Sequence, residues 1–345
     1  MNLSNEKQCQ KSACAKKTSI GGQALIEGIM MRGPKKSAMA VRNPEGEIVL
    51  EVCETQTKQP PKITKLPLLR GIFGFISSMK IGYKALMRSA EIAGLEEEIK
   101  SEPVETTETA ETAEAPKEKG SSAMMNLLMV VASILGVGLA VVLFIMLPTF
   151  LYRWCVPIMP FLAPENAALK SLVTSAFEGI LKIVILILYM LLVSLMKDIR
   201  RTFQYHGAEH KTIFCYEHGL ELTVDNVRNE RRFHPRCGTS FLVLMLLVGM
   251  FISFFIDPLF IWLTGDVPPT ILRALLKLLL LPLTMGIGYE LIKLAGRHDN
   301  RFTRIISAPG LWLQRVTVLE PTDDMIECAI TAFKEVIPED ESDNY

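Results

Sequence analysis

Four long apolar stretches dominate the pattern of hydrophobic and polar positions. The longest uncharged run covers residues 121–152, and three further runs cover 171–196, 239–256 and 271–294. A helix needs about 20 predominantly apolar residues to cross the core of a bilayer. The pattern therefore predicts a mainly α membrane protein with about four transmembrane helices.

Charged residues interrupt two of these runs. Glu178 and Lys182 lie in the second run, spaced i,i+4 in the favourable order. The fourth run carries Arg273, Lys277 and Glu290, and its proline and glycines make a helix there easier to bend. The last two runs therefore form either two full crossings or a re-entrant pair.

Basic residues in the connections predict the orientation of the spans. The connection between the first and second spans carries only Arg153 and Lys170. The connection between the second and third spans carries Lys197, Arg200, Arg201, Lys211, Arg228, Arg231, Arg232 and Arg236. Because Lys and Arg are enriched in cytoplasmic loops, this richer connection and both termini are expected to be cytoplasmic.

The remaining segments predict a small cytoplasmic α+β portion. Residues 37–54 have short apolar runs at 38–41 and 48–50 on either side of an Asn-Pro-Glu-Gly turn, which predicts an N-terminal β-hairpin. Residues 66–93 are apolar but dotted with basic side chains, which suits a helix on the cytoplasmic face of the membrane or a buried soluble helix. At the C-terminal end we expect a strand at 312–319 and a helix that starts near Thr322 or Asp323.

Composition and charge narrow the class of protein. Of 345 residues, 49% are hydrophobic and 21% charged, and the 37 basic and 37 acidic side chains cancel, so no nucleic-acid binder is indicated. The seven scattered cysteines favour reduced thiols over a disulfide framework. No apolar run follows the polar start of the chain directly, so we expect no cleavable signal peptide.

These observations divide the chain into seven segments. The segment at 96–120 is acidic, threonine-rich and too poor in apolar residues to fold. In order, we expect a disordered polar tail (1–18), a cytoplasmic β-hairpin and amphipathic helix (19–95), a disordered acidic linker (96–120), transmembrane helices 1 and 2 (121–197), a cytoplasmic His/Cys loop (198–238), transmembrane helices 3 and 4 (239–296) and a cytoplasmic C-terminal segment (297–345).

A cluster of histidines is the most distinctive chemical feature, with four of the five lying within residues 206–234. His206, Glu209 and His210 have the His-x-x-Glu-His spacing of the inverted zinc-peptidase motif. On a helix the two histidines would lie one turn apart on one face and could share a divalent metal ion such as zinc. Glu209 could then act as the general base, which predicts a metal-dependent hydrolase.

Such a site needs a third ligand, and the sequence leaves several open. The candidates are His234, Cys237, Cys215, His218 and Glu290. His234 and Cys237 stand out because a proline and a glycine would hold them on a tight turn just before the third span. Glu290 is the other main candidate, because an ionisable group within a membrane helix indicates a functional site.

Two other interpretations of the loop remain open. Cys237 could act as a nucleophile, because Arg236 and His234 would favour its thiolate, although such a neighbourhood is less specific than the metal motif. Alternatively, the loop is a polar extension of the second helix that meets anionic head groups, each Lys or Arg contributing on the order of 1 kcal/mol. The chain would then be a non-enzymatic assembly or anionic-lipid-binding protein of the bilayer.

Residues 21–34 form a second dense motif, which is rich in glycine. The motif lacks the spacing of a phosphate-binding glycine loop, so it is not a nucleotide site. We expect a structural turn, or close packing against the histidine loop with Glu27 and Arg32 as the polar contacts.

Five motifs along the chain resemble one family. They are residues 21–34, 198–212, 222–224, 234–241 and 309–315. Together they resemble the YqhQ family of bacterial membrane proteins, a domain of unknown function that is often labelled a predicted metal-dependent enzyme. The resemblance covers nearly the whole chain apart from the N-terminal tail and the acidic linker. It implies the inner membrane of a bacterium but no particular substrate or reaction.

Overall fold

The computed structural model describes residues 16–54, 66–94 and 131–343, apart from 267 and 299. The predicted linker, most of the predicted N-terminal tail and the first ten residues of the first predicted span lie outside the described residues. The chain divides into two compact units.

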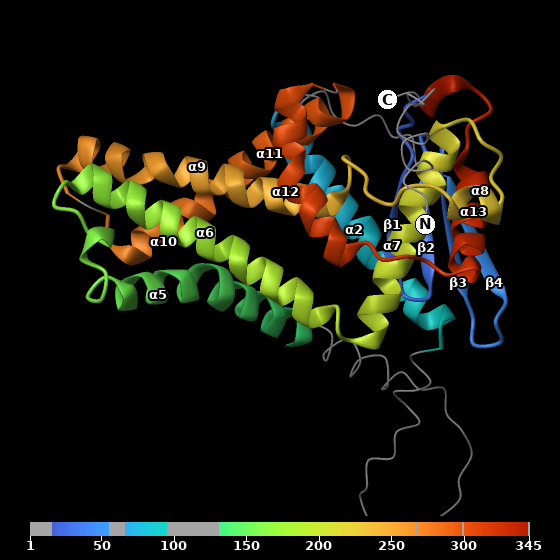
Figure 1. The fold of residues 1–345 in the computed structure, drawn as a ribbon, viewed down its shortest axis with the longest axis horizontal. Coiled ribbons are helices and arrows are strands. Elements are labelled where there is room, and N and C mark those ends of the chain that lie inside the picture. The colour runs from blue at the N-terminus through green and yellow to red at the C-terminus, as the bar shows by residue number, and fades with distance from the viewer. Residues whose placement is uncertain (1–15, 55–65, 95–130, 267, 299, 344–345) are drawn as a thin grey trace, which may run out of the picture. The chain divides into compact units, whose positions relative to one another are not determined.

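The first unit contains a four-stranded antiparallel sheet (Figure 1). In sheet order, its strands are β1 (Gly21–Leu25), β2 (Gly28–Arg32), β3 (Lys36–Arg42) and β4 (Ile48–Glu54). Strands β3 and β4 confirm the predicted hairpin. The interpretation of residues 21–34 as a turn is wrong, because they form β1 and β2. Residues 28–31 of β2 are all buried, so the strand lacks the alternation that identifies a half-exposed one.

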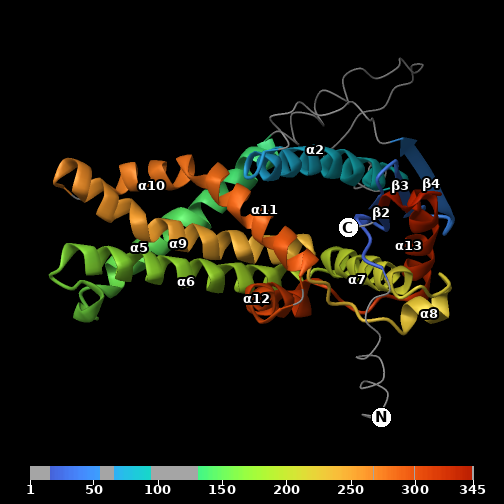
Figure 2. The same ribbon diagram turned by 90° about the horizontal axis from the view of Figure 1, so that it is seen from above.

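Helices cover both faces of this sheet (Figure 2). Helix α2 (Leu69–Ile92), the predicted amphipathic helix, packs on one face, and α7 (Lys197–Glu217) and α13 (Asp323–Val336) pack on the other. Successive strand residues point to opposite faces. Met30 therefore belongs to the apolar cluster under α2, and Met31 to the cluster under α7 and α13.

Two segments of the first unit differ from the expected structure, and a third agrees with it. The predicted His/Cys loop is largely helical, with α7 followed by the short α8 (Val224–Arg228). The strand predicted at 312–319 is wrong, because α12 (Arg301–Thr317) covers most of it. A capping box at Asn300 starts α12 upstream of this segment, so residues 312–317 form the last turns of the helix. Helix α13 follows Thr322 as predicted.

Within the part of the chain that the structure describes, three helices are long and apolar enough to cross a membrane: Val131–Cys155, which ends in α5 (Leu147–Cys155); Leu169–Val193 within α6 (Ala167–Val193); and α9 (Gly238–Thr264). A fourth candidate span consists of α10 (Thr270–Leu279) and α11 (Leu281–Arg297), which are bent at Leu280. Pro282 follows this break and cannot donate a backbone hydrogen bond. The prediction of about four spans thus becomes three, or four if the bent pair is one span.

Two buried carboxylates connect the helices of the second unit. Asp257 of α9 accepts hydrogen bonds from Ser171 Oγ (2.9 Å) and Arg273 Nε (2.9 Å). Glu178 of α6 accepts one from Lys277 Nζ at 2.6 Å. Each buried charge therefore has a partner of opposite charge on another helix, which offsets part of its desolvation cost.

Candidate metal centre

Helix α7 brings two of the predicted ligands together. His206 and His210 lie one turn apart, with ring centroids separated by 4.5 Å. Nδ1 of His206 is 3.0 Å from the carbonyl oxygen of Thr317, and Nδ1 of His210 is 2.5 Å from that of Arg232. A carbonyl can only accept, so each Nδ1 carries a proton, which leaves Nε2 as the atom for another partner.

Cys237 joins the two histidines from the turn before α9. Its Sγ is 3.2 Å from His206 Nε2 and 3.2 Å from Thr239 Oγ1. One ligand atom from each of His206, His210 and Cys237 lies within 4.8 Å of the other two. Two imidazoles and one thiolate are suitable zinc ligands, and three protein ligands leave a fourth position for water or substrate.

Burial and proximity shift the pKa values of this group. Burial alone would lower the pKa of His206, but the adjacent Cys237 outweighs it and raises the pKa to about 9. Burial alone would raise the pKa of Cys237, but His206 and His210 outweigh it and lower the pKa well below its usual value. This shift favours the thiolate form of Cys237, which is the form that binds a metal or attacks an electrophile.

Glu209 is buried next to this group. Burial raises its pKa, while His206 and His210 oppose that shift. Oε1 accepts a hydrogen bond from the backbone N–H of Gly22 at 3.0 Å, and Oε2 has no hydrogen-bond partner among the described residues. A carboxylate with one fixed and one free oxygen can accept a proton from a bound molecule.

The group opens into a cavity of about 520 Å³ within the first unit. Its walls include the three possible ligands, Glu209 and residues 18–24 around β1. This volume lies in the range of small-molecule sites. The cavity can thus hold a substrate against the ligand atoms and the free carboxylate oxygen.

His234 lies beside the group but is held by other partners. Its backbone N–H donates to Gln314 Oε1 at 2.8 Å, and its Nδ1 accepts from the backbone N–H of Arg236 at 3.2 Å. Burial lowers the pKa of His234 to about 4, even though Glu217 favours the charged ring. Neutral His234 therefore fixes the turn that carries Cys237, and it is not one of the three converging residues.

The other proposed third ligands also lie outside the group. Glu290 forms an ion pair with Arg70 of α2, with Nε 2.6 Å from Oε1. His218 Nδ1 is 2.8 Å from Glu230 Oε1. The buried Cys215 points its thiol at the carbonyl oxygen of Glu221 at 3.5 Å. Of the residues considered, the structure brings only His206, His210 and Cys237 together.

The glycine-rich motif contacts the histidine helix in two places. Glu27 forms a bidentate ion pair with Arg201 of α7. Gly22 lies so close to α7 that a Cβ there would meet the Glu209 carboxyl carbon at 3.0 Å. These contacts confirm close packing against the helix through Glu27, whereas Arg32 takes no part in them.

Sequence reasoning did not assign a role to Gln314 or to Glu217. Gln314 is fully buried, and its side chain donates to the His234 carbonyl oxygen (2.7 Å) and to Ser240 Oγ (2.8 Å). Glu217 is buried, forms an ion pair with Arg236 and accepts from the backbone N–H of Thr18 at 2.9 Å. A buried stripe of small and polar residues along α12 was the available signal for Gln314.

Comparison with known proteins gives the family but no activity. The family described as "Protein of unknown function (DUF1385)" matches residues 66–339. A Bacillus subtilis (strain 168) protein named "Uncharacterized protein YqhQ" is 35% identical over 327 residues, which cover 92% of each chain. No solved structure matches the chain. The chain therefore belongs to the DUF1385 family, as its resemblance to YqhQ-type proteins predicts.

Proposed function

We propose that the chain is an integral membrane protein with a metal-dependent hydrolase centre. His206, His210 and Cys237 would hold the metal, and Glu209 would act as the general base. The observation that carries this proposal is the orientation of the two histidines, because both Nδ1 atoms contact backbone carbonyls and leave Nε2 for the metal. Zinc is the metal that best suits this donor set.

Each residue would have a separate role in hydrolysis. A bound zinc ion would supply a water molecule with a pKa near 7 and would polarise the substrate. Glu209 would accept the proton through Oε2, while the Gly22 N–H holds Oε1 in place. Gln314 would fix the turn that presents the Cys237 thiolate. The cavity around β1 would bind the substrate and exclude bulk water.

Variants of these residues should fail in different ways. His206→Ala and His210→Ala each remove a ligand, so the metal content of the purified protein should fall sharply. His298→Ala is the matched control, because His298 is exposed and lies outside the 206–237 region. The metal content of this variant should equal that of the wild type. Glu209→Gln should keep the metal but lose at least about 100-fold in metal-dependent hydrolysis of p-nitrophenyl acetate.

Two outcomes would contradict this proposal. Unchanged metal content in both histidine variants would exclude the site. If metal is lost in both but Glu209→Gln hydrolyses at the wild-type rate, the metal is structural.

A thiolate nucleophile is a second candidate function. The 3.2 Å contact between His206 Nε2 and Cys237 Sγ, with the Thr317 carbonyl behind the ring, is the arrangement of a Cys-His pair. This mechanism requires no metal. Hydrolysis that survives chelation but is lost in Cys237→Ala would favour it over the metal centre.

We further propose that the site faces the cytoplasm from a bacterial inner membrane. The support is the excess of Lys and Arg between the second and third spans. In intact cells, a membrane-impermeant thiol reagent should label Glu165→Cys in a Cys155→Ser background, but not the exposed native Cys53. Cys215 and Cys237 are buried and cannot report on sidedness. The reverse labelling pattern would overturn this orientation.

A further inference from the structure

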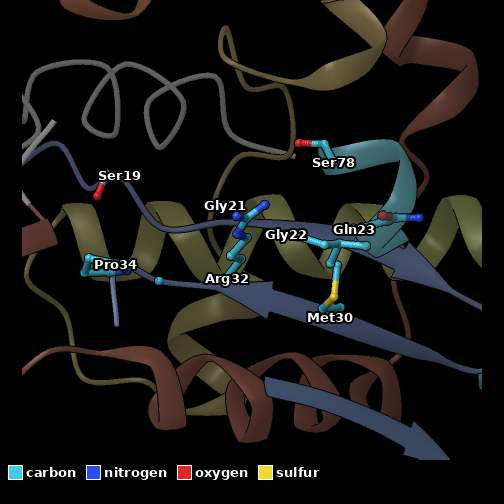
Figure 3. A pocket seen from close by; sticks show the side chains of 10 residues that line it. Ser19, Gly21, Gly22, Gln23, Met30, Arg32, Pro34 and Ser78 are labelled. Carbon is cyan, nitrogen blue, oxygen red and sulfur yellow. The ribbon is translucent and has the colours of Figure 1, made fainter. Parts of the chain in front are cut away.

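A second cavity, of about 320 Å³, lies on the opposite face of β1 from the histidines (Figure 3). It is bordered by β1, the end of β2 and helix α2. Arg32 pairs with Gly21 in the register of these strands. In Figure 3 the Arg32 side chain lies beside Gly21, and a Cβ at Gly21 would meet nothing within 4 Å.

Among the described residues, the polar side chains around this cavity have no partners. Arg32 is partly buried, yet its guanidinium makes no ion pair or hydrogen bond with the described residues. The side chains of Gln23, Ser19 and Ser78 also make no hydrogen bond there, and no carboxylate lines the cavity. Other arginines near the sheet behave differently: Arg42 pairs with Glu327, Arg201 with Glu27 and Arg236 with Glu217. The cavity therefore has an unbalanced positive charge and several free donors.

These donors match a phosphate group better than a carboxylate. A guanidinium, a carboxamide and two hydroxyl groups offer more N–H and O–H donors than the two oxygens of a carboxylate accept. Arginine binds phosphate through two parallel charge-assisted hydrogen bonds. A volume of about 320 Å³ is large enough for such a group.

The cavity adjoins the candidate metal centre. Both cavities are lined by Ser19, Gly21, Gly22 and Gln23. Strand β1 is an edge strand, and its two glycines add no side chain between the cavities. The Arg32 cavity and the histidine cavity therefore lie next to each other along β1.

We propose that the Arg32 cavity binds a phosphate group of the substrate while the bond to be hydrolysed lies at the histidines. The placement of the hydrolysed bond at the histidines rests on the proposed function. Phosphate binding at Arg32 does not require a metal. The phosphate belongs either to an anionic lipid head group or to a soluble phosphate ester.

The test is the binding of inorganic phosphate to the full-length protein. The protein is purified in a neutral detergent and treated with EDTA, and the dissociation constant is measured by calorimetry. Arg32→Gln should weaken binding at least about tenfold. Arg32→Lys keeps the positive charge but loses the paired N–H donors of the guanidinium, so it should have an intermediate effect. Lys36→Gln removes an exposed positive charge from the neighbouring strand and should change binding by less than about twofold.

A second measurement distinguishes the two sources of phosphate. Nanodiscs of phosphatidylglycerol and of a phosphate-free galactolipid are compared. If a lipid head group occupies the Arg32 cavity, phosphatidylglycerol should compete and weaken phosphate binding. Equal binding in both nanodiscs assigns the cavity to a soluble phosphate ester.

Two results would overturn the proposal. The first is an absence of phosphate binding to the folded wild-type protein, and the second is equal affinity of Arg32→Gln and Lys36→Gln. His206→Ala should bind phosphate as the wild type does, because it alters only the metal group. Loss of binding in His206→Ala but not in Arg32→Gln would place the phosphate at the histidines instead. Failure of the metal proposal alone would leave phosphate binding intact.

Discussion

Both units bury ionisable side chains, but they satisfy them in different ways. In the second unit, Asp257 pairs with Arg273 and Glu178 pairs with Lys277. In the candidate metal centre, Glu209 has one hydrogen bond from a backbone N–H and no Lys or Arg partner among the residues that the structure describes. The two histidines and Cys237 beside it direct Nε2 and Sγ toward one another.

The difference separates groups that hold the structure together from groups that await a ligand. A buried charge costs several kcal/mol unless a partner compensates it. The carboxylates of the second unit find that partner on a neighbouring helix. The ligand atoms of the candidate metal centre have each other and the Thr239 hydroxyl as neighbours, and a divalent cation would satisfy all three ligands at once.

The largest effect is expected where a paired charge loses its partner. Asp257→Ala leaves Arg273 among apolar helices without a carboxylate, and we expect the free energy of unfolding to fall by about 3–5 kcal/mol. Denaturation of the purified protein in detergent measures this loss. Asp266→Ala, at an exposed position after α9, should change stability by less than about 0.5 kcal/mol. A loss below about 1 kcal/mol for Asp257→Ala would show that the pair is not a structural support.

Two buried glutamates on α7 give a smaller but sharper contrast. At pH 7 and without metal, Glu217→Gln should destabilise the protein by about 3 kcal/mol, because it leaves Arg236 unpaired. Glu209→Gln should instead stabilise it by about 1 kcal/mol, because burial disfavours the wild-type carboxylate more than His206 and His210 favour it. Denaturation across a pH series measures both effects.

The pH dependence of the two variants should run in opposite directions. The folded-state pKa of Glu217 is lowered, so its contribution is present at neutral pH and disappears as the pH falls. The folded-state pKa of Glu209 is raised, so the wild type loses stability as the pH rises above about 4.5. The benefit of Glu209→Gln should therefore vanish below that pH. If both variants changed the free energy of unfolding in the same direction at pH 7, this contrast between Glu217 and Glu209 would be contradicted.

The sequence predicted the parts of the fold that have a strong periodic signal. The long apolar helices, the β3–β4 hairpin and the start of α13 agree with the structure. Strands β1 and β2 escaped notice because their residues include glycines and a continuously buried run. The 312–319 segment was misassigned because a local alternation gave no information on the capped start of α12.

The candidate site was predictable only in part. The spacing of His206 and His210 indicated two ligands, since that relation is local to one helix. The choice of Cys237 over His234 and Glu290 depends on partners far along the chain, namely Gln314 and Arg70. No local pattern encodes those contacts. The free Arg32 was visible in the sequence, but its lack of a partner was not.

The composition of the metal shell is the most direct test of the central claim. Full-length wild-type protein, purified without added chelator, should carry about one transition-metal ion per chain by mass spectrometry. X-ray absorption should then show one sulfur ligand at about 2.3 Å and nitrogen ligands at about 2.0–2.1 Å, as zinc held by one cysteine and two histidines requires. A protein without metal, or a metal shell without sulfur, would contradict the assignment of His206, His210 and Cys237.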